Sequence, residues 1–105
     1  MPAILYVRIK SDLDRQELER RMRRRRPRFR EVPGLIQKIY GRDETTGEFC
    51  GIYFFENGSD LAAFRETELA KTIPSAYEAV EVRPEIYEVL YPLYPERGPF
   101  AENSE

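Results

Sequence analysis

The chain has 105 residues, of which 41% are hydrophobic and 34% are charged, and its formal net charge is −2. This length fits one domain, since domains typically run to about 100 to 150 residues. The mean hydropathy is −0.64, and no apolar run approaches the roughly 20 residues that a membrane-spanning helix needs. We therefore expect one soluble domain over residues 1–92, followed by a loosely held tail over residues 93–105.

The absent residue types exclude several classes of site. The sequence contains no histidine and no tryptophan, and Cys50 is its one cysteine. A single chain therefore lacks an imidazole base, an ordinary zinc or haem site, a thiolate cluster and an internal disulfide. We expect no metal and no protein-bound cofactor. Because the start at Met1 lacks the features of a secretory signal, we expect a cytoplasmic protein.

The first half of the chain predicts a strand, a helix and a second strand. Residues 3–9 are β-branched and aromatic with a two-residue alternation, which is typical of a strand. A helix is expected after Ser11-Asp12, and Pro27 should kink it or end it near Arg26. Pro33-Gly34 then leads into a second alternating strand over residues 35–41. The apolar stripe expected on the helix consists of Leu13, Leu18, Met22 and Phe29.

The second half predicts a strand, a helix and a final strand. Residues 49–56 are almost wholly apolar, so we expect a strand buried on both faces. Residues 57–60 provide a turn and a helix start, and the helix should end at Pro74. Alternation over residues 80–91 predicts the last strand, in which Pro84 requires a bend or an edge position.

The resulting order, β-α-β-β-α-β, predicts a ferredoxin-like α+β sandwich in which two helices cover one face of a four-stranded antiparallel sheet. The other face of the sheet is then uncovered and carries apolar side chains. An exposed apolar patch of this size usually marks an association surface. We expect a homodimer formed through this face.

Short motifs on this pattern carry a family resemblance. Pro33-Gly34-Leu35 leads into Gln37-Lys38-Ile39-Tyr40, Gly51 precedes Ile52-Tyr53-Phe54-Phe55, and a helix starts near residues 59–64. Over roughly residues 3 to 91 the chain resembles the dimeric α+β barrel superfamily of small cofactor-free monooxygenases, and most closely its YdhR-like monooxygenase family. The resemblance implies a dimer whose sheets form a barrel, with a ligand pocket between sheet and helices.

The resemblance transfers no mechanism. Characterised oxygenases of the superfamily use asparagine, tryptophan and histidine in various combinations, whereas this chain offers only Asn57 and Asn103. The sequence therefore assigns no catalytic residue. Fold alone does not determine function.

Tyrosines and cations on the strands are the best candidates for a ligand site. A planar phenolic or carboxylated ligand, or the enolate or phenolate formed from it, would suit such residues. The competing interpretation is that the tyrosines only pack the core and the dimer face. The strand register that decides which of them share a face is not readable from the sequence. The candidates are Tyr6, Arg8, Lys38, Tyr40, Tyr53 and Tyr87.

Three function hypotheses follow. The first is a monooxygenase-like enzyme that acts on a small aromatic molecule, and the second is a non-catalytic homodimer that binds such a ligand. The third is an RNA-binding domain that uses the arginines between Arg20 and Arg30. Glu17, Glu19 and Glu31 flank those arginines, which favours a solvated, salt-bridged helix face and makes nucleic acid the weakest hypothesis. Cys50 is expected to be an inert buried thiol rather than a nucleophile. Glu81, Glu85 and Glu88 could include a general base, but exposed carboxylates on an edge strand are the favoured interpretation.

Overall fold

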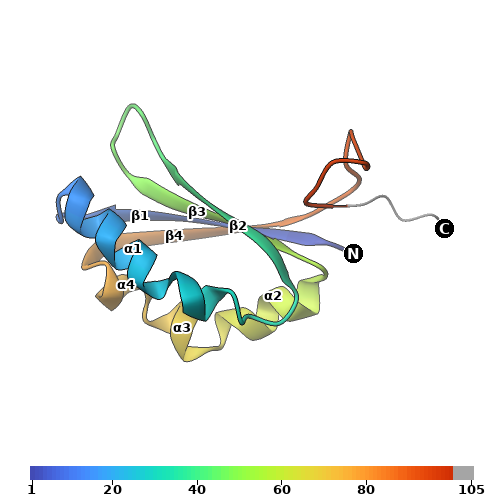
Figure 1. Ribbon diagram of the computed structural model, residues 1–105, viewed down its shortest axis with the longest axis horizontal. Coiled ribbons are helices and arrows are strands. Elements are labelled where there is room, and N and C mark those ends of the chain that lie inside the picture. The colour runs from blue at the N-terminus through green and yellow to red at the C-terminus, as the bar shows by residue number, and fades with distance from the viewer. Residues whose placement is uncertain (101–105) are drawn as a thin grey trace.

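The computed structural model describes residues 1–100 and contains one four-stranded antiparallel sheet with all helices on one side of it (Figure 1). The strand order is β2-β3-β1-β4, so β2 and β4 form the edges. This arrangement confirms the predicted ferredoxin-like α+β fold. The elements are β1 (Ala3–Ser11), α1 (Arg15–Phe29), β2 (Leu35–Arg42), β3 (Phe49–Phe55), α2 (Gly58–Arg65), α3 (Glu68–Lys71), α4 (Ile73–Ala76) and β4 (Ala79–Glu88).

The core lies between the sheet and the helices. In β1 the alternate residues Ala3, Leu5, Val7 and Ile9 are buried, as the two-residue period requires. In β3, however, only Phe49, Tyr53 and Phe55 are buried, and the residues between them are half-buried. The prediction that this strand is buried on both faces was wrong, because helices cover only one face of the antiparallel sheet.

Pro27 was expected to kink the helix or to end it near Arg26. Helix α1 continues through Pro27 to Phe29, so the second of these alternatives was wrong. A proline so close to the helix end removes only one intrahelical hydrogen bond. The Arg30 N–H still donates to the Arg26 carbonyl at 3.2 Å, which closes the last turn. Phe29, only 3% exposed, packs 6.0 Å from the ring of Tyr53 and 6.1 Å from that of Phe64, and this burial holds the end of α1 on the core.

The second helical region is three short helices rather than one helix ending at Pro74. Thr67 interrupts it, because its side chain accepts a hydrogen bond from the Ala70 N–H and starts α3 as an N-cap. Pro74 lies in the first turn of α4, where its missing N–H costs nothing. Tyr77 then ends α4, and β4 runs along the sheet edge, where Pro84 is tolerated.

The face of the sheet away from the helices, here called the outer face, is apolar at its centre. Ile39 of β2 pairs with Ile52 of β3, which pairs in turn with Tyr6 of β1. The chain after β4 turns back over one end of this face, and Phe100 packs edge-on against Phe54 at 5.3 Å. Residues 101–105 of the predicted tail lie outside the described residues. Within residues 1–100 no helix has both the length and the hydropathy to cross a membrane.

Candidate functional site

The strand registers divide the six candidate residues between the two faces of the sheet. Lys38 pairs with Tyr53, and Tyr40 pairs with Gly51, which places these side chains on the helix-covered face. Arg8 pairs with Arg83, and Ile4 pairs with Tyr87, which places Arg8, Tyr87 and Tyr6 on the outer face. The six residues therefore do not converge on one cavity, and only Lys38, Tyr40 and Tyr53 share the face that the helices cover.

A register shift in β2 places Lys38 on that face. Leu35 pairs with Phe55, but Gln37 already pairs with Phe54, so Ile36 is an extra residue in the strand. Such a bulge reverses the alternation beyond it. Leu35 and Lys38, three residues apart, consequently lie on the same face, which the simple alternation predicted over residues 35–41 would not allow.

The Lys38 amine lies among aromatic rings. Its Nζ is 3.4 Å from the ring centroid of Phe29, 4.4 Å from that of Tyr40 and 4.5 Å from that of Tyr53. Among the ion pairs of residues 1–100, none involves Lys38. Gly51 makes room for the lysine stem, since a Cβ there would lie 3.2 Å from Lys38 Cε and 3.0 Å from Tyr53 Cε1. When the amine is protonated, its charge makes cation–π contacts with these rings.

Burial changes the titration of this group of residues. Desolvation, helped by the positive charge of Arg25, lowers the pKa of Lys38 to about 7. Desolvation also raises the pKa of the neighbouring hydroxyls of Tyr40 and Tyr53, so both stay protonated at neutral pH. An amine with a pKa near 7 is about half uncharged at neutral pH, so it can accept a proton or act as a nucleophile, which an ordinary exposed lysine does poorly.

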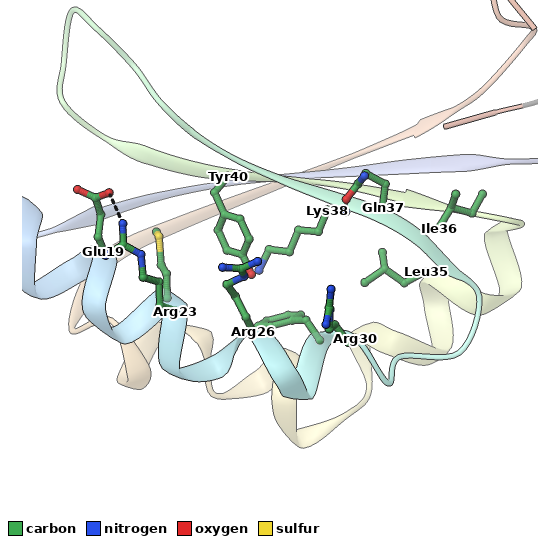
Figure 2. A pocket seen from close by; sticks show the side chains of 11 residues that line it. Glu19, Arg23, Arg26, Arg30, Leu35, Ile36, Gln37, Lys38 and Tyr40 are labelled. Carbon is green, nitrogen blue, oxygen red and sulfur yellow. Dashed lines mark hydrogen bonds and ion pairs between the residues drawn. The ribbon is translucent and has the colours of Figure 1, made fainter. Parts of the chain in front are cut away.

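Lys38 lines a pocket of about 570 Å³ between α1 and β2 (Figure 2). This volume is within the range of small-molecule sites. The stem of Lys38 extends from β2 toward the Tyr40 ring, and Arg26 approaches the same place from α1. The lining residues come from these two elements and the turn after α1: Glu19, Met22, Arg23, Arg26, Phe29, Arg30, Leu35, Ile36, Gln37, Lys38 and Tyr40.

A second, much smaller cavity of about 20 Å³ lies deeper, and Met22, Lys38 and Tyr40 line both cavities. It has room for about one water molecule. The Tyr77 hydroxyl, which is buried and has no hydrogen-bond partner among the described residues, belongs to a residue that lines it. Burial raises the pKa of Tyr77 to about 12, so this hydroxyl remains a donor at neutral pH. The space between sheet and helices is thus nearly filled, and the room for a ligand is beside α1.

Arg25 is a residue of this region that the sequence interpretation missed. It lies in line with Leu18, Met22 and Phe29 on α1, at spacings of four, three and four residues. Its guanidinium donates to the Leu69 carbonyl at 2.7 Å and lies 5.4 Å from the ring centroid of Tyr77. The spacing is the signal that could have identified it, whereas the arginine run as a whole predicts a solvated, salt-bridged helix face.

Other arginines of α1 do form ion pairs on its surface. Glu17 pairs with Arg20 and, at 2.8 Å, with Arg21, while Glu19 pairs with Arg15 at 3.1 Å. This is the salt-bridged helix face that the sequence favours. Arg21 also reaches Glu78 at 3.0 Å, which ties α1 to the turn before β4.

The remaining candidates are engaged outside the pocket. Arg8 forms an ion pair with Asp43 at 2.5 Å, and Tyr87 donates a hydrogen bond to Glu85 at 3.1 Å on an exposed strand. Backbone N–H groups of Thr46 and Thr45, followed by Arg8, lower the pKa of Asp43.

The outer-face cysteine and the acidic residues also show no sign of a reactive centre. Cys50 is a free thiol that is half-buried rather than buried as predicted, because its side chain lies on the face that no helix covers. Glu81, Glu85 and Glu88 are exposed on the edge strand β4. Among residues 1–100, no three Cys, Asp or Glu side chains are grouped to hold a metal ion.

Comparison with solved structures places this geometry in a known fold. SnoaB, a cofactor-independent oxygenase from Streptomyces nogalater, superposes with a TM-score of 0.72 at 12% identity, over 88% of this chain and 96% of that chain. A "putative antibiotic biosynthesis monooxygenase" from Nitrosomonas europaea gives 0.70 at 19% identity, over 87% and 92%. PA3566 from Pseudomonas aeruginosa gives 0.64 at 20% identity, over 85% and 94%. At these identities the likeness shows the fold alone.

A search of curated proteins gives no match. The sequence does match the protein family described as "Putative mono-oxygenase ydhR" over residues 4–94, which is most of the chain. With the ferredoxin-like sheet and the lysine-containing pocket in place, this match identifies the chain as a member of the ydhR mono-oxygenase family.

Proposed function

We propose that this protein binds a small phenolic or similarly acidic aromatic molecule in the pocket between α1 and β2 and oxidises it with dioxygen, without a protein-bound cofactor. One observation carries the proposal. The Lys38 amine, within 4.5 Å of three aromatic ring centroids and without an ion-pair partner among the described residues, lines a pocket large enough for such a molecule. Membership of the mono-oxygenase family supports the choice of oxygen chemistry.

Lys38 would supply the acid–base chemistry. Its neutral amine takes the proton from a phenol hydroxyl or from a CH₂ group beside a carbonyl, and the resulting ammonium pairs with the phenolate or enolate. The electron-rich anion then reacts with dioxygen directly. For a CH₂ group, one oxygen atom replaces the two hydrogens to give a carbonyl, and the other oxygen atom leaves with those hydrogens as water. For a phenol, one oxygen atom is added at a ring C–H to give a quinone, and the other leaves as water with the ring hydrogen and the hydroxyl hydrogen.

The aromatic walls would hold the substrate ring. Phe29 and Tyr40 line the pocket, and offset or edge-to-face contacts with a planar ligand suit their geometry. Tyr53 lies behind Lys38 as a buried wall, so its ring positions the amine rather than the ligand. Tyr6, Arg8 and Tyr87, on the outer face, have no part in this proposal.

We also propose that the protein is a homodimer joined through the outer face, where Ile39 is 48% exposed and Tyr87 51% exposed. Apolar side chains exposed together on one sheet face are typical of an association surface. A reducing compartment such as the cytoplasm suits a chain whose one cysteine is a free thiol.

The test is oxygen uptake with anthrone, a ketone whose CH₂ group lies between two aromatic rings. We expect the protein to consume oxygen and Lys38→Met to lower the rate about a hundredfold or more, the usual contribution of a positioned base. Lys38→Arg keeps the positive charge but not the base and should be equally impaired. Lys71→Met, at an exposed lysine on α3, is the matched control and should match the wild-type protein.

Two results would contradict the proposal in different ways. Binding of anthrone in the pocket without oxygen uptake would identify a non-catalytic binding protein, which is the second hypothesis from the sequence. Oxygen uptake that is unchanged in Lys38→Met would exclude Lys38 as the base.

A further inference from the structure

The pocket beside α1 has a basic rim. Arg23, Arg26 and Arg30 line it from α1, and their spacing of three and four residues places them on one side of the helix. All three are exposed, and Arg23 has only a long contact of 3.9 Å with Glu19. Figure 2 shows Arg26 and Arg30 reaching from α1 toward the pocket. Such a rim attracts an anionic group, and guanidinium groups bind carboxylates through paired hydrogen bonds.

Below this rim the lining is apolar. Met22, Phe29 and Leu35 lie between the arginines and the sheet, and Phe29 and Tyr40 present their rings to Lys38. A ligand that fits both the basic rim and the apolar lining has an anionic end at the arginines and an aromatic or apolar body below them. The reactive end of such a ligand would then reach the Lys38 amine.

Lys38 is suited to react covalently with that end. Its Nζ is buried beside three aromatic rings and has no carboxylate partner among the described residues, so loss of hydration favours the uncharged, nucleophilic form of the amine. The lowered pKa of Lys38, about 7, agrees with this geometry. The other two lysines of the sequence, Lys10 and Lys71, are exposed and line neither cavity.

We infer that Lys38 forms an imine with an aromatic aldehyde or ketone that carries a carboxylate, with Arg26 and Arg30 holding the carboxylate. The amine lone pair attacks the carbonyl carbon, a C–N bond forms, and the carbonyl oxygen leaves as water with the two amine protons. The step needs neither dioxygen nor a cofactor. It therefore goes beyond the proposed oxidation, although it uses the same pocket.

The experiment is reductive trapping with para-carboxybenzaldehyde under argon. Borohydride transfers a hydride to the imine carbon and leaves a stable secondary amine, which peptide mass spectrometry locates. Each labelling rate is divided by that of the same aldehyde with a free lysine amine, and benzaldehyde serves as the probe without a carboxylate. We expect the carboxylated aldehyde to label Lys38 about tenfold faster than benzaldehyde does, as one charged hydrogen bond would give.

Variants separate the two parts of the inference. Arg26→Met with Arg30→Met should abolish the preference for the carboxylated aldehyde, whereas Arg24→Met with Arg28→Met, at exposed arginines that do not line the pocket, should keep it. Lys38→Arg should leave label only on Lys10, Lys71 and the N-terminal amine.

Labelling of Lys38 no faster than that of Lys10 and Lys71 would overturn the imine site. Equal labelling by both aldehydes would overturn the role of the arginines. Because argon removes the oxidant, these results are independent of whether the protein consumes oxygen.

Discussion

At the scale of single residues, Lys38 shows how packing rather than sequence neighbours sets chemistry. Its flanking residues Gln37 and Ile39 give no sign of an unusual lysine. The aromatic rings near its amine come from α1, β2 and β3, which only the folded chain brings together. Burial among these rings removes water from the amine and disfavours the ammonium form. Because the pKa of Lys38 then differs between the folded and unfolded states, the free energy of unfolding depends on pH.

The stability of the wild-type protein should rise with pH relative to Lys38→Met. In the unfolded chain Lys38 binds its proton up to an ordinary lysine pKa of 10.5, but in the folded protein only up to about 7. Between these values unfolding takes up a proton, so raising the pH favours the folded state. From about pH 6 to about pH 9 the difference in unfolding free energy should shift by on the order of 2 kcal/mol toward the wild type.

Urea unfolding of both proteins at several pH values measures this shift, and the variant supplies the background from all other groups. Lys71→Met is the control, because its exposed side chain should leave the pH dependence of the wild type unchanged. Parallel curves for the wild type and Lys38→Met would show that the amine is not desolvated in the folded protein.

At the scale of elements, the order of strands and helices follows from alternation and from turn residues, and the structure agrees with it. The details that differ have specific causes. The bulge at Ile36 is defined by how β2 pairs with β3. The alternation of residues within β2 cannot predict it, because the sequence of one strand does not give its register with a neighbour. The site was only partly predictable for this reason, since that bulge decides that Lys38 and Tyr40 face the helices. The outer-face position of Arg8 and Tyr6 follows instead from the regular alternation of β1.

Arg25 was missed for a related reason. A helix stripe that is identified from apolar residues alone does not include an arginine. An arginine at the same spacing can nevertheless bury its aliphatic stem and place its guanidinium at a backbone carbonyl. Arg25 does this in α1, where it donates to the Leu69 carbonyl at 2.7 Å and connects α1 with α3.

We expect Arg25→Met to destabilise the protein by about 1 to 2 kcal/mol, because it removes a charged donor from a half-buried carbonyl while keeping most of the packing. Arg24→Met, next to it on the exposed side of α1, should change the unfolding free energy by less than about 0.5 kcal/mol. Urea unfolding of the two variants makes the comparison. Equal effects would mean that Arg25 contributes no more than any surface arginine of the helix.

At the scale of the whole molecule, the helices all cover one face of the sheet and leave the outer face with a central apolar row of Ile39, Ile52 and Tyr6. Phe100 covers only the end of this face, at Phe54. A second copy of the chain offers the same apolar face, so two sheets can bury each other around a two-fold axis. The exposed apolar side chains after β4, such as Leu90 at 74% and Leu93 at 82%, would gain cover in the same assembly.

Light scattering after size-exclusion chromatography should therefore give twice the chain mass of 12.4 kDa, unchanged by dilution or by added salt, because the contact is apolar rather than ionic. Ile39→Glu places a charge at the centre of the buried face and should shift the protein to the monomer mass while circular dichroism stays that of the folded chain. Ala62→Glu adds the same charge on the exposed side of α2 and should remain dimeric. A wild-type protein with a measured mass of 12.4 kDa at every concentration would exclude the dimer. The apolar outer face would then be exposed to water in the native protein.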